Sequence, residues 1–302
     1  MRKLLILTLI GFAAQLIDGS LGMAYGVTSA SLLLMFGIAP AIASASVHFA
    51  EVVTTAASGI SHFRFGNVDK EIVWKLTVPG SVGAFAGACF LSRLPGELVK
   101  PYVSAFLFLL GVYVFVRFLF HVKPKQTTDG GKKGFLTPLG LIAGFLDATG
   151  GGGWGPLATP MLLARDGLKV RKVIGSVDTS EFAIAVSATA GFLISLGWSQ
   201  VNWLWVGALM IGGVFAAPLA AWIVRVIPQN LLGILVGGLI LVTNAKVIMS
   251  VLGWSDFWQM AIYIVLFSIW VTSFLYAVWR NRKPSSIMAD HQEQVEHDES
   301  FQ

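Results

Sequence analysis

Six ionisable side chains stand inside or at the ends of long apolar stretches, where a charged group is costly and usually faces an interior cavity. These side chains are Asp18, His48, Glu51, Asp147, Asp178 and Glu181. His48 and Glu51 are three residues apart, so they share one face of a helix. Asp178 and Glu181 have the same spacing. Buried carboxyl and imidazole groups exchange protons near neutral pH. The sequence therefore predicts four proton-coupling or gating residues: His48, Glu51, Asp178 and Glu181.

The two aspartates that precede glycine-rich stretches have a second interpretation. Asp18 stands before "GSLG" and Asp147 before "ATGGGG", so we expect both to cap helix ends at a break in a hairpin. The other acidic residues are open to the same capping role. A metal site is a further alternative, because His-x-x-Glu beside Asp-x-x-Glu could supply ligands from two helices. Only one histidine, His48, stands at membrane depth, so we predict no metal site.

The stretch "DATGGGGWGP" at 147–156 places four consecutive glycines in a strongly apolar part of the chain. Non-helical backbone within a bilayer is tolerated only where protein covers it or where it lines a polar cavity. A helix that restarts after such a break presents free N–H groups, which together with the helix dipole favour an anion. The motif "IDGSLGMAYG" at 17–26 offers similar glycines and two hydroxyl groups. Close packing of helices is the alternative reason for these small residues.

We expect the two glycine-rich breaks to meet near the middle of the bilayer and to form a small anion site. Lys246 either offsets the charge of the anion or extends to the membrane surface. The glycines are not followed by the G-K-[ST] of a phosphate-binding loop, and we predict no cofactor. The predicted substrate-binding residues are Ser20, Gly22, Tyr25, Thr149, Gly151, Gly152, Gly153, Trp154 and Ser176.

The composition is that of a membrane protein, since 55% of the 302 residues are hydrophobic and 12% are charged. Soluble domains carry roughly twice that share of charged residues. The formal charge of +5 comes with lysines and arginines at the ends of apolar stretches, which favours a lipid bilayer and not a nucleic acid as partner. The start, "MRKLLILTLIGFAAQ", also fits a signal peptide, although the stretch continues into a second apolar run. We expect a multi-pass protein of the cell (plasma) membrane, with apolar segments at about 4–36, 41–62, 72–92, 101–120, 136–164, 173–197, 203–224, 231–252 and 257–279.

The chain resembles itself at a spacing of about 130 residues. "IDGSLGMAYG" aligns with "LDATGGGGWG", which pairs Asp18 with Asp147 and Tyr25 with Trp154. "SVHFAE" aligns with "SVDTSE" 130 residues later, and "SRLPGEL" resembles "VRVIPQNL" further along each copy. Three matches in the same order indicate an internal duplication.

The loop charges favour opposite orientations of the two copies. Segments 4–36 and 136–164 are longer than one span, so we expect each to be a helical hairpin that enters and leaves on the same face. Each copy then crosses three more times, and the positive loops 62–75, 117–133 and 165–172 and the tail from Arg280 fall on the cytoplasmic side. Arg2, Lys3, Arg93 and Lys100 fall outside and count against this topology. The expected fold class is an all-α polytopic membrane protein with two inverted repeats, each a glycine-broken hairpin plus three transmembrane helices, and one extra C-terminal transmembrane helix. The expected units are a first membrane repeat at 1–120, a polar basic loop at 121–135, a second membrane repeat at 136–252, an additional transmembrane helix at 257–280 and a disordered polar tail at 281–302.

The paired motifs "LIDGSLGMAYG" and "FLDATGGGGWGP", together with "SVHFAEVVTTAASGISHFRFGNVD", resemble the TauE/SafE family of membrane proteins, also called sulfite exporters. The resemblance runs over about residues 5–250. It implies a secondary transporter of small sulfur-containing or organic anions such as sulfite or a sulfonate, with export as the usual direction. The first motif departs from the fuller glycine run of many members, so the resemblance does not imply equal substrate contacts in both halves.

Two other classes of function stay open at this stage. A membrane-embedded enzyme would use His48 with Glu51 as a general base or as metal ligands, but neither G-x-S-x-G nor H-E-x-x-H occurs. An anion channel would conduct the same ion without saturating. The sequence favours a transporter of a small anion, with proton coupling through the buried acids, over an enzyme. It leaves the oligomeric state open.

Overall fold

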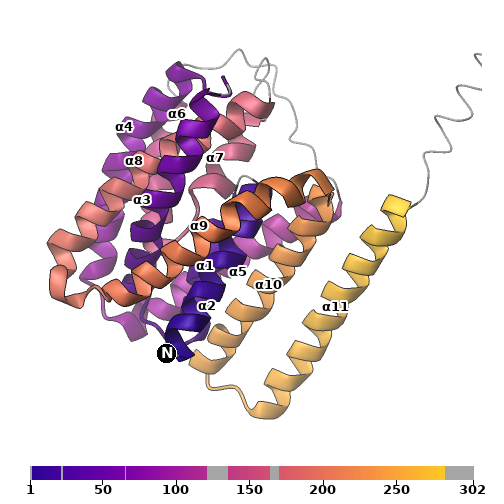
Figure 1. Cartoon of the computed structure of the whole chain (residues 1–302). Helices are drawn as coiled ribbons and strands as arrows, with labels where there is room; N and C mark the ends of the chain where they lie inside the picture. The colour runs from indigo at the N-terminus through magenta and orange to yellow at the C-terminus, as the bar shows by residue number, and fades with distance from the viewer. Residues whose placement is uncertain are drawn as a thin grey trace, which may run out of the picture.

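The computed structural model describes residues 2–21, 23–64, 66–120, 135–163, 170–226 and 228–282. Over these residues the chain is helical and contains no strand, which confirms the predicted all-α class. The predicted basic loop and tail lie almost entirely outside the described residues. The elements in chain order are α1 (Arg2–Leu21), α2 (Tyr25–Met35), α3 (Pro40–Arg64), α4 (Lys70–Ser92), α5 (Gly96–Leu119), α6 (Leu136–Gly150), α7 (Trp154–Leu163), α8 (Val170–Leu196), the short 3₁₀ turn Trp198–Gln200, α9 (Trp203–Val226), α10 (Gln229–Val251) and α11 (Asp256–Arg282), as Figure 1 shows.

Five of the described helices are long and apolar enough to cross a membrane, namely α4, α5, α8, α10 and α11. The chain is therefore a polytopic membrane protein. α3 has 25 residues, but it is less apolar because it carries polar side chains along its length, and many of these are buried against neighbouring helices. α2 has 11 residues and α6 has 15, which is shorter than the roughly 20 residues that a full crossing requires.

Helices from the two halves of the chain pack against each other reciprocally. α1 of the first half lies along α9 of the second, and α6 of the second half lies along α4 of the first. Glycines permit both contacts. A Cβ atom added at Gly212 in α9 would lie 2.0 Å from the Thr8 carbonyl oxygen in α1. One added at Gly144 in α6 would lie 2.2 Å from the Gly80 carbonyl oxygen in α4. Such close backbone approach at small residues is typical of helix packing in membranes.

Basic side chains mark one end of the molecule. Lys172 donates through Nζ to the Val68 carbonyl oxygen at 2.8 Å, which ties the start of α8 to the connection between α3 and α4. Arg64 ends α3 and Lys70 begins α4 at this same connection. We call this the basic end and define it by Arg64, Lys70 and Lys172. Figure 1 draws α6 and α7 toward this upper end and the N-terminus at the lower end.

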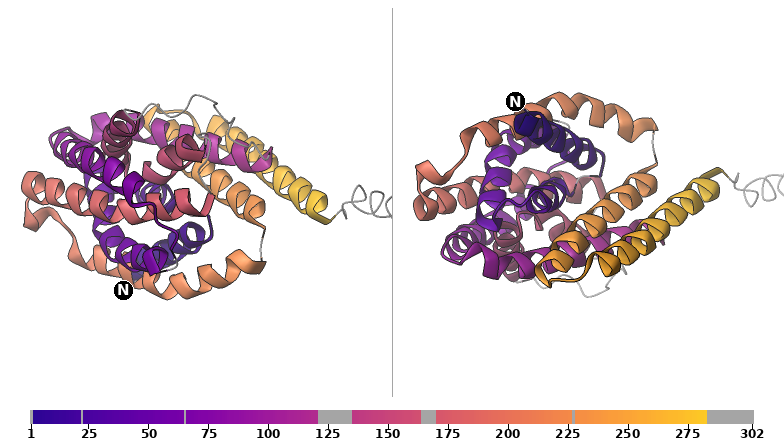
Figure 2. Two further views of the ribbon diagram at one scale, coloured as in Figure 1. Left: turned by 90° about the horizontal axis from the view of Figure 1, so that it is seen from above. Right: turned by 90° about the horizontal axis from the view of Figure 1, so that it is seen from below.

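The last helix, α11, lies at the rim of the bundle and packs on α10, as Figure 2 shows from above and below. Trp270 fixes α11 by donating its indole N–H to the Ile234 carbonyl oxygen at 3.1 Å, with its ring against Gly238. Most other large apolar side chains of α11 are exposed, including Phe257, Trp258, Ile264, Phe267 and Leu275. In a bilayer this face contacts lipid.

Candidate functional site

The second glycine-rich stretch is a break between α6 and α7 that Asp147 spans. Gly151 has φ of 73° and ends α6, and its N–H donates to the Asp147 carbonyl oxygen at 2.8 Å. The Gly152 N–H donates to the same oxygen at 3.0 Å. The Asp147 side chain then accepts from the Trp154 N–H through Oδ1 at 2.9 Å, which caps the start of α7. One aspartate therefore holds both sides of the break.

The first hairpin repeats this construction between α1 and α2. Ala24 has φ of 110°, a left-handed conformation that is rare outside glycine, and it precedes the first residue of α2. The Tyr25 N–H donates to Asp18 Oδ1 at 3.2 Å, so Asp18 reaches seven residues forward, as Asp147 does. The two breaks thus use residues that the internal repeat aligns, Asp18 with Asp147 and Tyr25 with Trp154.

The two breaks touch each other inside the bundle. We call Met23–Gly26 the first tip and Gly150–Trp154 the second tip. A Cβ atom added at Gly26 would lie 2.6 Å from Gly152 Cα, and one added at Gly152 would lie 2.1 Å from the Val27 backbone nitrogen. No side chain fits between the two backbones at this contact. The glycines are therefore required for the tips to meet.

Replacing Gly152 with alanine should force the tips apart. The methyl group would overlap backbone atoms of α2, and backbone moves less readily than a flexible side chain. We expect a loss of about 1–3 kcal/mol of unfolding free energy, the usual range for an overpacked core. Thermal unfolding in detergent would measure it. Gly207→Ala in α9 is the matched control, because no atom lies within 4 Å of its added Cβ. Equal stability of the two variants would contradict the tip contact.

His48 connects the second tip to α3. Its Nε2 lies 3.1 Å from Asp147 Oδ2, and its Nδ1 lies 2.8 Å from the Ser44 carbonyl oxygen. The Ser44 hydroxyl oxygen also lies 3.3 Å from Nδ1. The Ser44 hydroxyl donates to the Ala148 carbonyl oxygen at 2.6 Å and ties α3 to the end of α6. The His48 ring therefore joins α3 to Asp147 at the second tip.

Glu51 lies next to this pair and faces both tips. Its Oε2 is 4.0 Å from His48 Nε2. Its Oε1 lies 3.0 Å from the Cβ position of Gly26, and no described residue hydrogen-bonds to this oxygen. Only 2% of the Glu51 surface is exposed. This is a carboxyl oxygen without a hydrogen-bond partner at the contact between the tips.

Further carboxyl groups surround the tips. Glu181 on α8 interacts electrostatically with Glu51 on α3, and also with Asp18, Asp147 and Asp178. Five acidic side chains in one buried region repel each other strongly, since two unit charges a few ångströms apart interact by several kcal/mol at reduced dielectric. The region holds its acids only with protons or a cation to offset them. In the described part of the chain no group of histidine, cysteine and acidic side chains has the geometry to hold a metal ion.

Trp154 is a core residue at the second tip. It is fully buried, and its indole N–H donates to the Val177 carbonyl oxygen at 3.1 Å. A Cβ atom added at Gly80 would lie 2.7 Å from the Trp154 ring, and it would also contact the Ile184 side chain. The ring thus fastens α7 to α4 and α8. Its backbone N–H, and not its ring, belongs to the break.

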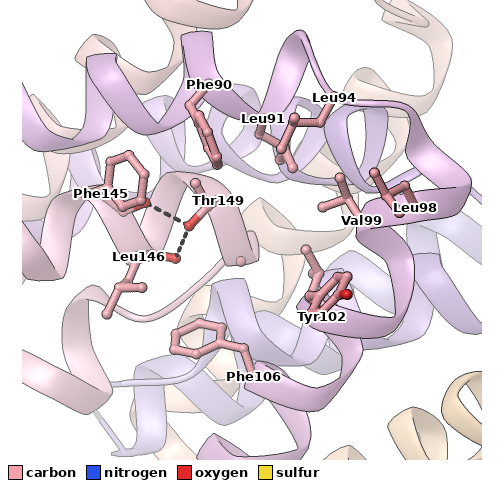
Figure 3. Close-up of a pocket in the computed structure, with 12 residues that line it drawn as sticks. Phe90, Leu91, Leu94, Leu98, Val99, Tyr102, Phe106, Phe145, Leu146 and Thr149 are labelled. Carbon is pink, nitrogen blue, oxygen red and sulfur yellow. Dashed lines mark hydrogen bonds between the residues drawn. The ribbon is translucent and has the colours of Figure 1, made fainter.

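Thr149 faces away from the tip contact. Its hydroxyl donates to the Phe145 and Leu146 carbonyl oxygens at 2.8 and 3.2 Å, as the dashed lines in Figure 3 show. It lines a pocket of about 340 Å³ between the ends of α4 and α6 and the start of α5. Apolar side chains dominate this pocket, which Phe106 and Gly150 also line. The pocket carries no basic side chain to attract an anion.

The other predicted binding residues are divided between the tips and the basic end. Tyr25 is buried at the first tip, and no described residue hydrogen-bonds to its hydroxyl. Ser176 lies at the basic end, where it accepts from the Asp69 backbone N–H at 2.8 Å. The side chain of Ser20 and all of Gly22 lie outside the described residues. Lys246 is exposed on α10.

The sequence analysis missed a cation beside the first tip. The Arg117 guanidinium comes from the last turn of α5 and lies 3.8 Å from the sulfur of Met23, with Tyr113 Oη at 3.2 Å. Arg117 ends an apolar stretch, so it was counted only among the basic residues that set orientation. Nothing in its local sequence signals the contact, because Met23 is 94 residues away.

Comparison with known proteins places this arrangement in a family. The family model described as sulfite exporter TauE/SafE matches residues 7–247, which include both hairpins and both tips. The chain belongs to the TauE/SafE family. α11 lies beyond the matched range, so this TauE/SafE protein carries one helix outside the family model.

Two curated relatives come from Bacillus subtilis (strain 168). The probable membrane transporter protein YtnM is 60% identical over 281 residues, which cover 92% of this chain and 93% of the relative. The probable membrane transporter protein YdhB is 27% identical over 233 residues, which cover 76% of this chain and 93% of that relative. No solved structure matches the chain. Family and relatives identify a membrane transporter and not an enzyme.

Proposed function

We propose that this protein is a secondary transporter that binds a small sulfur-containing or organic anion, such as sulfite or a sulfonate, beside the contact of the two hairpin tips. The contact between the tips carries the proposal, because it brings two helix N-termini to one buried place. The family description supports a sulfur-containing anion as cargo and export as the direction.

Backbone N–H groups at the tips are available to such an anion. Among the described residues, none accepts a hydrogen bond from the N–H of Gly153 at the second tip or from that of Gly155 in the first turn of α7. The start of a helix favours negative charge through its N–H groups and its dipole. Arg117 adds a full positive charge beside the first tip. The tips and Arg117 together supply the donors that an oxyanion requires.

The surrounding acids make protons part of binding. An anion at the tips would meet the carboxyl groups of Glu51 and Glu181, and ionised carboxylates would repel it. Protonation of these groups removes the repulsion, so anion and protons bind together. Lower pH then strengthens anion binding, and anion and protons move in the same direction, so export of the anion carries protons with it and an imposed proton gradient drives the anion. This reasoning assigns proton coupling to His48, Glu51, Asp178 and Glu181.

The packing supports two inverted repeats that rock about the tips. α1 on α9 and α6 on α4 are equivalent contacts under the internal repeat, as a twofold relation between the halves requires. The first hairpin begins at the end opposite the basic end, and the second begins at the basic end (Figure 1). The positive-inside rule then puts the basic end in the cytoplasm of a cell with this protein in its plasma membrane.

Replacing Arg117 with glutamine should weaken anion binding about tenfold to a hundredfold. Hydrogen bonds to charged groups contribute about 1.5–3 kcal/mol, and about 1.4 kcal/mol corresponds to a factor of ten. The anion-induced rise of Tm, measured over a concentration series, reports the change. Arg64→Gln, at an exposed position of the basic end, should bind like the wild type. Unchanged binding by Arg117→Gln would place the anion elsewhere.

Counterflow in liposomes tests the proposed function. Purified protein is reconstituted with unlabelled sulfonate inside, and labelled sulfonate is added outside at low concentration. A transporter exchanges the two, so the label accumulates transiently above its external concentration, and the initial rate saturates. A channel gives no transient accumulation and no saturation. Chemical conversion of the label would indicate an enzyme. Either of the last two results would overturn the proposal.

A further inference from the structure

One face of α3 is polar from the tips to the basic end. Glu51, Thr55, Ser58 and His62 follow each other at spacings of three or four residues, so they lie in one row along the helix. Thr55 donates through its hydroxyl to the Glu51 carbonyl oxygen at 2.6 Å. His62 is in the last turn of α3, and 27% of its side chain is exposed. The row therefore runs from a buried carboxyl group to a side chain that reaches the surface.

Acidic side chains of α8 and α1 face this row. The Ser58 hydroxyl hydrogen-bonds to the Asp178 carboxylate. Asp178 Oδ2 lies 4.0 Å from His62 Nε2. Asp18 from α1 interacts electrostatically with Asp178, and Glu181 does so with Glu51. Polar side chains thus lie along the row from His62 to Glu51.

The equivalent row in the second half of the chain is apolar. The alignment of "SVHFAE" with "SVDTSE" places Ala185, Ala188 and Phe192 of α8 where α3 has Thr55, Ser58 and His62. All three α8 side chains are fully buried. The Phe192 ring lies 6.0 Å from the His48 ring, centroid to centroid. Phe192 therefore covers His48 on the side that leads away from the basic end.

We infer that α3 and α8 form a proton path that connects the acids at the tips with the basic end alone, through Ser58, Asp178 and His62. The path rests on the proposed function for its purpose, since it would deliver or remove, at the basic end, the protons that accompany the anion; at the opposite end these protons enter or leave together with the anion. The difference between the two equivalent rows gives the path its direction. The polar row of α3 opens to the basic end, while the apolar row of α8 closes the opposite end.

Cysteine accessibility tests the path without any measurement of transport. Cys89 is the single cysteine of the chain, so Cys89→Ala provides a background without thiols. Ser58→Cys and its equivalent Ala188→Cys are then treated in sealed vesicles with a membrane-impermeant methanethiosulfonate cation, or with Ag⁺ as a smaller probe. Lys70→Cys and Ser199→Cys, exposed at opposite ends, report which side the reagent reaches.

The path predicts that Ser58→Cys reacts only with reagent on the Lys70 side and at least tenfold faster than Ala188→Cys. Thr55→Cys and Ala185→Cys provide a second matched pair. Equal rates for both members of each pair, or reaction of Ser58→Cys from the Ser199 side, would overturn the path and leave the transport proposal intact. If the cysteine variants react as predicted but the protein moves no anion, the transport proposal is overturned instead.

His62→Phe gives the polar row of α3 the same residue that α8 has at the aligned position, Phe192. It should slow the reaction of Ser58→Cys at least tenfold and slow anion uptake driven by protons from the basic end. Anion-induced stabilisation in detergent should stay at the wild-type level, because His62 is remote from the tips. Unchanged Ser58→Cys labelling in this variant would show that His62 does not line the path.

Discussion

Replacing Asp147 with alanine should destabilise the protein by about 3–5 kcal/mol, the usual cost of deleting one partner of a buried ion pair. Asp147 accepts from the Trp154 N–H with one carboxyl oxygen and lies 3.1 Å from His48 with the other. Alanine removes both contacts, leaves the start of α7 without its cap, and leaves His48 without its partner at full burial. Denaturation by heat or by SDS titration in mild detergent measures the loss.

Asp18→Ala is the matched control for this prediction. Asp18 caps Tyr25 at the first tip in the same way, but the residue of α8 that aligns with His48 is Asp178 and not a histidine. Loss of a cap alone costs about 1 kcal/mol. Asp147→Asn should fall between the two alanine variants, because the amide oxygen still accepts from Trp154 while the charge beside His48 is lost. Equal losses for Asp147→Ala and Asp18→Ala would contradict the structural role of the His48 pair.

Replacing Glu51 with glutamine should abolish accumulation of the anion by a proton gradient while leaving exchange of anions intact. In the wild type each coupled proton allows about tenfold accumulation per pH unit, since one unit corresponds to about 1.36 kcal/mol. Glutamine has the shape of a protonated glutamate but cannot release a proton. The transport cycle of this variant therefore lacks the step in which residue 51 binds and releases a proton. A sulfonate is the suitable cargo because its own charge is constant over this pH range.

The sign of the pH effect on binding follows from the same argument. Wild-type anion affinity should rise as pH falls, because protonation removes negative charge from the tips. Glu51→Gln should bind the anion at neutral pH at least as well as the wild type. The slope of its log affinity against pH should correspond to about one proton fewer taken up with the anion. Glu71→Gln, at an exposed position of α4, should behave as the wild type in both assays. A Glu51→Gln protein that still accumulates the sulfonate with the pH gradient would refute the role of Glu51.

The breaks in the helices were predictable because backbone chemistry is local. Four successive glycines destabilise a helix because each loses much backbone entropy there, so they indicate a break, and an aspartate before them can cap the helix that follows. The internal repeat then extended the reasoning to the first hairpin, where the helix breaks at Ala24, a residue that by itself gives no signal. The structure reports the same capping contact in both places, through Asp18 and Asp147.

The partners across the tips were not predictable from one sequence. His48 meets Asp147 across 99 residues, and Arg117 meets Met23 across 94, and these contacts depend on how α3, α5 and the hairpins pack. Ser176, which we predict among the binding residues, likewise has a partner that the sequence does not signal, the backbone N–H of Asp69 at the basic end.

Hydrogen–deuterium exchange with and without the anion tests most directly whether the two tips bind it together. The protein is held in lipid nanodiscs, and the peptides that contain Tyr25–Val27 and Gly151–Gly155 are followed after addition of saturating sulfite or sulfonate. We predict that exchange slows in both peptides at once and that Arg117→Gln reverses the effect at the same concentration. Transport by a protein in which the anion protects only one of these peptides, or neither, would contradict a site shared by the two tips.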